Sequence, residues 1–246
     1  MQTKSNKNIT VLLSIFGLIF LVMPFISSCG KGTNVGPSLL NVRYQVVNLS
    51  PDLGSVDLYV KYIKVNSSSY FYPSASGYFA LPSIDTPFQI RPGTTLVAGT
   101  TAPSYNIFTI DSLLKPNMKY TLMIVGFNKF TDSLHYIITK DTSALPSLGR
   151  GKVRFINASP LTPVGLNVTA NDSTLFSGAL YRQVSAYKEL PAGIYDFKIY
   201  TKGSTNILRD VPNVTIQDGR AYTLYTYGLT GHTDSLAFGS GFITNY

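Results

Sequence analysis

The chain contains one sequence pattern twice in tandem. Residues 155–160 (FINASP) repeat residues 46–51 (VVNLSP), and further matches follow in the same order along the chain. These pair residues 56–60 with 164–168, 78–82 with 187–191, 120–122 with 222–224, and 131–134 with 233–236. The spacing of about 100 residues exceeds the roughly 20 to 50 residues of a solenoid repeat. The pattern therefore indicates a duplicated domain.

Each copy has the sequence pattern of β-strands. Val56, Leu58 and Val60 alternate with other residues, and positions 164, 166 and 168 repeat this alternation in the second copy. A period of two places one face of a strand on a core and the other toward water. Turn-forming residues lie between such runs, at 50–52, 116–117, 191–193 and 218–219. No segment after residue 38 keeps a helical period, so we predict an all-β fold with two tandem antiparallel β-sandwiches, immunoglobulin- or transthyretin-like.

The amino-acid composition of the connecting segments predicts the domain boundaries. Residues 29–39 are rich in Gly, Ser and Pro and are predicted to be a flexible tether. The first β-sandwich is expected at 40–145 and the second at 150–246. The connection from Asp141 to Gly151 is short, so we expect the two domains to touch.

The N-terminus has the layout of an export signal. Lys4 and Lys7 precede an apolar run that ends in Ile26-Ser27-Ser28-Cys29. An aliphatic residue and two small residues before a cysteine resemble the lipobox of bacterial lipoproteins. We therefore predict that residues 1–28 are a lipoprotein signal peptide and that Cys29 is the lipidated residue. An uncleaved transmembrane anchor, which needs about 20 apolar residues, and a chance cysteine are the alternatives.

Cys29 is the only cysteine, so no disulfide can stabilise the exported chain. Fatty acyl chains such as palmitate on this residue would supply the two or more chains that stable membrane anchoring requires. Gly30 follows the cysteine where an aspartate would favour inner-membrane retention, so we expect an outer-membrane lipoprotein. Residues 30–34 lack the acidic cluster of Bacteroidota-type surface export. The choice between the periplasmic and the cell-surface face stays open.

Charge and composition limit the kinds of binding partner that the protein can have. The chain carries 20 Lys and Arg against 12 Asp and Glu, and removing Lys4 and Lys7 leaves 18 against 12, a net charge of +6. This mild excess could attract anionic polysaccharide or could simply keep the protein soluble. The basic residues form no long run, so nucleic acid is not expected as a partner. Envelope proteins and polysaccharide remain possible partners, besides the membrane.

The sequence offers few residues for catalysis or metal binding. His135 and His232 occupy non-equivalent positions in the two copies, and Glu189 is the only glutamate. Asp52 and Asp57 lack the spacing of a calcium loop. Two distant aspartates could still meet in space, although nothing singles out a pair. We predict no catalytic residue, no metal site and no cofactor, and a structural role for the repeated Asn-x-Ser-Pro motif.

A resemblance to a known family rests on four motifs. These are VRYQVVNLSP (42–51), VRFINASP (153–160), LPAG (190–193) and the Tyr-Thr-Leu strand of each copy. The motifs resemble the family called domain of unknown function 4397, and the resemblance covers both copies from about residue 40 onward. It implies exported bacterial proteins, often lipoproteins, with tandem β-sandwich modules. It brings no established catalytic residues.

Four serines lie in a possible modification motif. Ser112, Ser133, Ser173 and Ser235 each follow an aspartate and precede Leu or Thr. This order resembles the Asp-Ser/Thr-apolar acceptor of Bacteroidota O-glycosylation, and we predict that some of these serines carry glycan.

Two functional hypotheses follow. The first is a non-catalytic cell-envelope lipoprotein with a structural, adhesion or assembly role. The alternative is a carbohydrate-binding accessory lipoprotein of a glycan-uptake or surface-polysaccharide system. Six tyrosines could stack on sugars or could pack in the core: Tyr59, Tyr62, Tyr70, Tyr72, Tyr225 and Tyr227.

Overall fold

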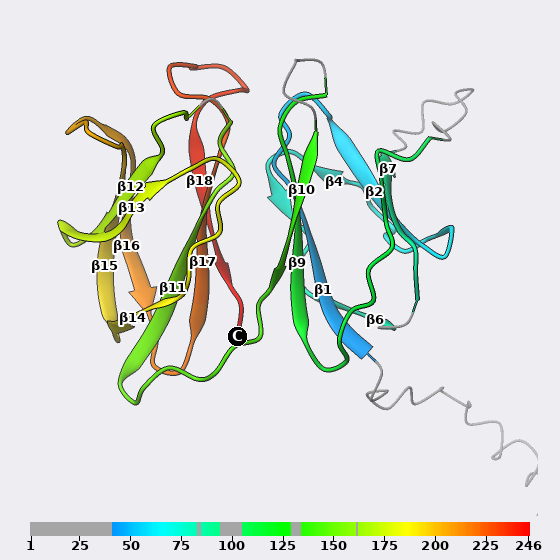
Figure 1. Cartoon of the computed structure of the whole chain (residues 1–246), viewed down its shortest axis with the longest axis horizontal. Coiled ribbons are helices and arrows are strands. Elements are labelled where there is room, and N and C mark those ends of the chain that lie inside the picture. The colour runs from blue at the N-terminus through cyan, green and yellow to red at the C-terminus, as the bar shows by residue number, and fades with distance from the viewer. Residues whose placement is uncertain (1–40, 83–84, 94–104, 129–133, 161) are drawn as a thin grey trace, which may run out of the picture. The chain divides into compact units, whose positions relative to one another are not determined.

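The structure is a computed structural model that describes residues 41–82, 85–93, 105–128, 134–160 and 162–246 (Figure 1). Leu39–Tyr246 forms one compact unit. Every regular element in the described part is a β-strand. Within those residues there is no helix long and apolar enough to cross a bilayer.

The strands divide into two modules with no strand pairing between them. Module 1 comprises β1 (Asn41–Asn48), β2 (Ser55–Val60), β3 (Ile63–Lys64), β4 (Tyr70–Phe71), β5 (Ser74–Ala75), β6 (Phe79–Pro82), β7 (Phe88–Pro92), β8 (Phe108–Ile110), β9 (Lys119–Val125) and β10 (His135–Lys140). Module 2 comprises β11 (Arg150–Asn157), β12 (Leu166–Ala170), β13 (Ser173–Ala179), β14 (Lys188–Pro191), β15 (Gly193–Thr201), β16 (Ile207–Ile216), β17 (Ala221–Tyr227) and β18 (Gly239–Thr244).

Each module is a sandwich of two sheets. In module 1 the inner sheet has the order β10-β9-β1-β5, with β6 also on β1, and the outer sheet has the order β3-β2-β7-β8, with β4 also on β2. In module 2 the inner sheet is β14-β11-β17-β18 and the outer sheet is β13-β12-β15-β16. Each module buries its own apolar cluster between its two sheets. The prediction of tandem β-sandwiches is confirmed.

One strand pair in each module departs from a purely antiparallel arrangement. β1 runs parallel to β9, and β11 runs parallel to β17, whereas the other paired strands are antiparallel. Parallel neighbours need a long crossover between them. Here the crossover is the outer sheet itself, because the chain leaves β1 or β11, builds the outer sheet and then returns to the inner one.

The central strands of the inner sheets, β1, β9, β11 and β17, are buried on both faces. In β9, Tyr120, Leu122 and Ile124 join the core of module 1, while Met123 and Val125 point the other way into a third apolar cluster. Sequence alternation predicted that this second face would meet water, and that prediction was wrong for the inner sheets. It failed because alternation identifies the two faces of a strand but does not reveal what covers each face.

The third cluster joins the modules. Its module 1 members lie on or next to β1, β9 and β10, and its module 2 members lie on or next to β11, β17 and β18: Val47, Leu49, Met123, Val125, Ile137, Ile156, Ala158, Tyr225 and Ile243. The two inner sheets therefore pack face to face, and β9, β10, β11 and β17 lie at the centre of Figure 1. The modules touch, as the short connection predicts.

Candidate functional site at the intermodule interface

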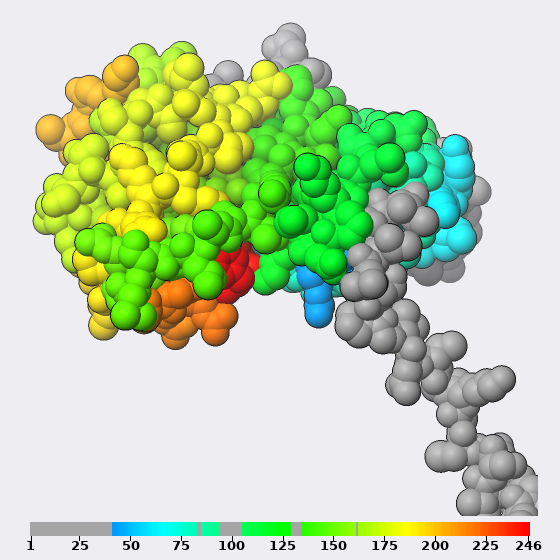
Figure 2. All heavy atoms as spheres, turned by 60° about the horizontal axis from the view of Figure 1, so that its bottom comes forward, coloured from blue at the N-terminus to red at the C-terminus, as the bar shows by residue number. Residues whose placement is uncertain are grey.

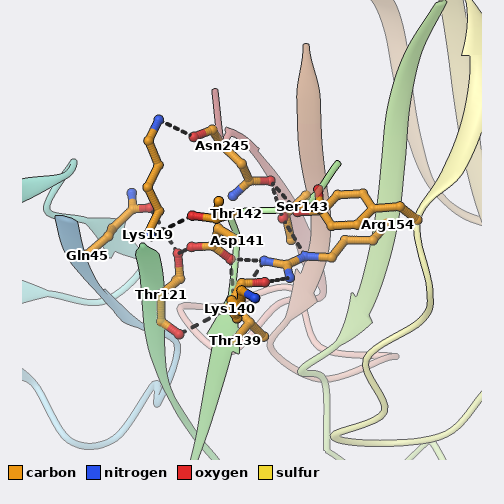
Figure 3. A network of polar contacts seen from close by, with 12 residues as sticks. Gln45, Lys119, Thr121, Thr139, Lys140, Asp141, Thr142, Ser143, Arg154 and Asn245 are labelled. Carbon is orange, nitrogen blue, oxygen red and sulfur yellow. Dashed lines mark hydrogen bonds and ion pairs between the residues drawn. The ribbon is translucent and has the colours of Figure 1, made fainter. Parts of the chain in front are cut away.

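A buried ion pair lies in the contact between the inner sheets. Asp141 directly follows β10 of module 1, and Arg154 lies in β11 of module 2. The guanidinium Nη2 donates to the Asp141 carboxylate, and the Arg154 and Asp141 side chains are 4% and 0% exposed (Figure 3). An ion pair removed from water in this way needs further hydrogen bonds to offset its lost hydration.

The Asp141 carboxylate has those hydrogen bonds. Oδ1 accepts from Thr139 Oγ1 at 2.8 Å as well as from Arg154. Oδ2 accepts from Thr121 Oγ1 and Tyr78 Oη, each at 2.7 Å. Three hydroxyls and a guanidinium thus occupy the carboxylate, so it is saturated as an acceptor.

Each nitrogen of the Arg154 guanidinium group also donates a hydrogen bond. Nε donates to Thr223 Oγ1 at 2.9 Å, Nη1 to the Lys140 carbonyl at 3.2 Å, and Nη2 also to Thr139 Oγ1 at 2.9 Å. The guanidinium carbon lies 5.0 Å from the centre of the Tyr187 ring, which is within the range of a cation–π contact. Arg154 therefore connects two strands of its own module to the end of β10 in the other.

Asn245, which directly follows β18, carries a second set of contacts between the modules. Its Nδ2 donates to Tyr78 Oη at 2.9 Å, and its carbonyl accepts from Lys119 Nζ at 2.7 Å. Its own side-chain oxygen accepts from Thr223 Oγ1 at 2.7 Å. Burial, followed by the nearby Asp141 charge, raises the pKa of Tyr78 well above its ordinary value, so this hydroxyl stays protonated. It can therefore donate to Asp141 while accepting from Asn245.

The connection between the modules packs over this network. Lys152 Nζ donates to the carbonyl of Ala144, and the Tyr246 hydroxyl donates to the same carbonyl at 3.1 Å. Ser143 Oγ lies 3.3 Å from that hydroxyl. Figure 2 shows the red C-terminal residues next to the green connecting segment. The connection is part of the interface, whereas the sequence predicted only a joint.

Tyrosine rings complete the apolar part of the interface. Tyr72 of module 1 meets Tyr227 of module 2 edge to face, with ring centres 5.7 Å apart. The rings of Tyr225 and Tyr227 lie over Gly241 and Gly239 of the neighbouring strand β18, where any Cβ would overlap them. These two glycines thus make room for the aromatic side of the contact.

Comparison with known proteins identifies the family. Two segments, residues 42–164 and 164–239, match the family model described as a domain of unknown function, DUF4397. The chain belongs to the DUF4397 family. The boundary at 164 falls after β11, whereas β11 pairs with β14 and β17 of module 2. We place β11 in the second DUF4397 module on the basis of this pairing.

The other comparisons add little about this DUF4397 protein. No curated protein matches the chain. A crystal structure of a candidate cell adhesion protein from Bacteroides eggerthii shares 8% identity, with 87% of this chain and 97% of that chain covered. Its TM-score is 0.23, so the similarity carries no conclusion about this protein.

The predicted modification sites do not come together. Cys29 and Ser133 lie outside the described residues. Ser112, Ser173 and Ser235 are exposed, in a loop, at the start of β13 and in a turn, respectively. Their exposure allows a glycosyltransferase to reach them, but glycosylation of these serines stays a prediction.

The repeated Asn-x-Ser-Pro motif stabilises the fold of each DUF4397 module. Asn157, at the end of β11, donates to the Ala179 carbonyl at the end of β13, and Asn48, at the end of β1, donates to the Tyr70 carbonyl in β4. Each amide oxygen also accepts the backbone N–H two residues on, of Ser159 or Ser50. Both asparagines are fully buried and join the inner sheet to the outer one. The structural role predicted for this motif is confirmed.

The two histidines and the aspartates Asp52 and Asp57 each have separate contacts. His135 begins β10, whereas His232 lies in an exposed loop with its Nδ1 3.6 Å from Asp234. Asp57 is buried against Lys64, whose Nζ lies 2.8 Å away, and Asp52 accepts from the backbone N–H of Asn128. In the described part of the chain no three His, Cys, Asp or Glu residues are grouped to hold a metal ion.

Three of the six candidate sugar-binding tyrosines lie in the intermodule contact. Tyr72 and Tyr227 pack on each other, and Tyr225 is buried beside them. On the outer sheet of module 1, Tyr59 stacks under Arg91, while Tyr62 is exposed. The six rings therefore do not form one exposed surface.

An open pocket lies at the edge of the interface instead. It has a volume of about 520 Å³ and is lined by β10 and by the segment between β13 and β14: Tyr136, Ile137, Leu180, Tyr181, Arg182 and Gln183. Arg182 takes a positive φ of 65°, unusual for a residue with a side chain, and its guanidinium lies 5.5 Å from the Tyr181 ring centre. No motif in the sequence predicted this pocket.

The pairing of Asp141 with Arg154 was not predicted from the sequence either. Asp141 was assigned to the connection between domains, and Arg154 was noted only as part of a family motif. A signal was available in the repeat. Gln45 in copy 1 corresponds to Arg154 in copy 2, and Asp141 corresponds to Asn245, so one copy carries the acid and the other the base.

Proposed function

We propose that this protein is a non-catalytic cell-envelope lipoprotein in which a lipid on Cys29 holds two joined β-sandwiches at the outer membrane. Its role is structural, adhesive or in assembly. The observation that carries the proposal is the interface. An ion pair, a shell of hydroxyls and an apolar cluster join the two modules, which suits a structural or adhesive role.

The network also accounts for the most enzyme-like residues of the chain. A general base needs a free lone pair within hydrogen-bond reach of a substrate proton. The Asp141 oxygens are occupied by four donors and lie in a fully buried site. The chemistry of this cluster therefore favours cohesion between the modules over catalysis.

Lipidation is tested with a clickable palmitate analogue fed to cells that produce either the wild-type chain or Cys29→Ser. We expect label on the wild type and none on the variant, because the chain has no other cysteine. Equal labelling of both chains, or of neither, would contradict the anchor. Protease added to intact cells then separates the cell-surface face from the periplasmic face.

The envelope role is tested by deleting the gene and complementing it with wild type or Cys29→Ser. Loss of adherence or of detergent resistance, restored only by the wild type, supports the proposal. A hydrolase activity in the purified protein that one substitution abolishes would contradict it.

The open pocket favours carbohydrate binding as a second candidate function. It combines two aromatic rings, a guanidinium and an amide, a set that binds sugar rings and their hydroxyls. A glycan array compares wild type with Tyr181→Ala and with Tyr62→Ala, an exposed tyrosine that does not line the pocket. Binding lost only in Tyr181→Ala supports this function, and an array without hits opposes it.

A further inference from the structure

We propose that the interface carries a pairing code, so that the inner face of module 1 fits module 2 and neither inner face fits a copy of itself. The partner of either face, within one chain or between two chains, is then the other module. The pairing code concerns only the two faces and does not depend on the lipid anchor.

The two faces are built from equivalent positions. Gln45 lies opposite Thr121 across the parallel pair of module 1, and Arg154 lies opposite Thr223 across that of module 2. Asp141 and Asn245 each follow the last residue of the neighbouring edge strand. Their backbone N–H groups donate to the carbonyls of Lys119 and Ala221, two residues before those threonines.

The residues that both modules contribute to the Asp141–Arg154 network are neutral, and its acid and base come from different modules, whereas Lys119 and Lys152 donate to backbone carbonyls. Each module contributes a tyrosine and a threonine: Tyr78 and Thr121 from module 1, Tyr187 and Thr223 from module 2. Module 1 adds an acid and an amide, Asp141 and Gln45. Module 2 adds a base and an amide, Arg154 and Asn245.

Only the mixed combination matches these charges. Two copies of module 1 face to face would bury two carboxylates with glutamine at the position of the base. Two copies of module 2 would bury two guanidiniums with asparagine at the position of the acid. A buried charge without its counter-ion is strongly destabilising, and interfaces use such mismatches to reject wrong partners.

The connection allows modules to be exchanged between chains. Residues 141–149 separate β10 from β11, and nine extended residues span about 30 Å. Opening this segment would let module 1 of one chain meet module 2 of another. A second copy of this chain is therefore the external partner that the code permits.

The test uses two variants of Leu39–Tyr246, the compact unit that contains all described strands. Asp141→Asn leaves Arg154 without an acid, and Arg154→Gln leaves Asp141 without a base. In a dimer that exchanges modules between the two variants, one interface contains Asp141 with Arg154, and the other has neutral amides at both of these positions. Neither variant can form that combination alone.

One variant is labelled with ¹⁵N, both are unfolded in urea, and they are refolded separately and as an equimolar mixture. Native mass spectrometry is expected to show a mixed-label dimer in the mixture and no dimer of any kind in either separate sample. Equal dimer formation by each variant alone would overturn the code. Absence of the mixed dimer, whether the mixed chains stay monomeric or precipitate, would overturn it as well.

Two controls keep the test specific. The chain with both substitutions lacks both charges of the Asp141–Arg154 pair and is expected to refold as a soluble monomer, which would show that the amides fit the site. A mixture of Asp172→Asn and Lys198→Gln neutralises an ion pair of the outer sheet of module 2, in which the Asp172 side chain is 77% exposed. That mixture is expected to give no mixed dimer.

Discussion

Replacing Asp141 by Asn should be among the most damaging single changes in this protein. The substitution keeps the shape of the side chain and removes its charge. The hydroxyls of Thr121, Thr139 and Tyr78 can rotate to donate elsewhere or to accept from the new amide. Arg154 cannot adapt in this way, because it stays charged and only 4% exposed.

The expected loss in the free energy of unfolding follows from this difference between Arg154 and the hydroxyls. Removing one member of a buried ion pair costs about 3–5 kcal/mol, since the other charge is left uncompensated. Arg154→Gln should cost less, because the carboxylate keeps three hydroxyl donors. With both residues neutral no charge is left unpaired, so the double variant should cost less than Asp141→Asn alone.

Urea unfolding of the Leu39–Tyr246 unit, followed by circular dichroism, measures these values. The wild type should unfold in a single transition because the interface couples its modules. Asp141→Asn should shift the midpoint to lower urea and separate the unfolding of the modules into two transitions.

The four proteins form a double-mutant cycle, which isolates the interaction between the two side chains. A coupling free energy of several kcal/mol is expected. If each single substitution costs less than about 1 kcal/mol and the two effects add, the ion pair does not hold the modules together. That result would refute the claim that a buried, uncompensated charge separates them.

Three further predictions use the same assay. Asn157→Ala should lower the free energy of unfolding by at least about 2 kcal/mol, because each buried group left without a partner costs about 1–3 kcal/mol. The control Asn206→Ala, at an exposed position, should change it little. Equal costs would contradict the structural role of the motif. Gly241→Ala should cost about 1–3 kcal/mol because its Cβ overlaps the Tyr225 ring, and a stability like that of Ser240→Ala would show that the ring moves away freely. Burial raises the pKa of Tyr72, Tyr187 and Tyr225 to about 12, so the unfolded chain loses these protons first, near pH 10. The free energy of unfolding should therefore fall as the pH rises above about 10. Constant stability up to pH 12 would contradict this.

The sequence predicted most of the fold because its signals are local or repeated. Alternation at Val56, Leu58 and Val60 identified β2, and the repeated Asn-x-Ser-Pro motif marked the ends of β1 and β11. The parallel pairing of β1 with β9 was not predictable from alternation, because a strand has the same pattern in either direction.

The interface was harder to predict because it depends on what covers a sheet. The second face of β9 carries Thr121, Met123 and Val125. This mixture of polar and apolar side chains does not show whether water or another sheet covers the face. Asp141 was assigned to a loop, since the chain leaves the strand at that point. Its burial follows only from the arrangement of the two modules, which no local pattern encodes.

Packing equivalent faces against each other also limits how many modules can assemble. A contact between the same surface on both partners closes on itself, whereas a head-to-tail contact can continue without end. In this protein each inner sheet is already covered by the other. A third module of the same kind would find no inner face to bind, so longer arrays built on this contact would add modules in pairs.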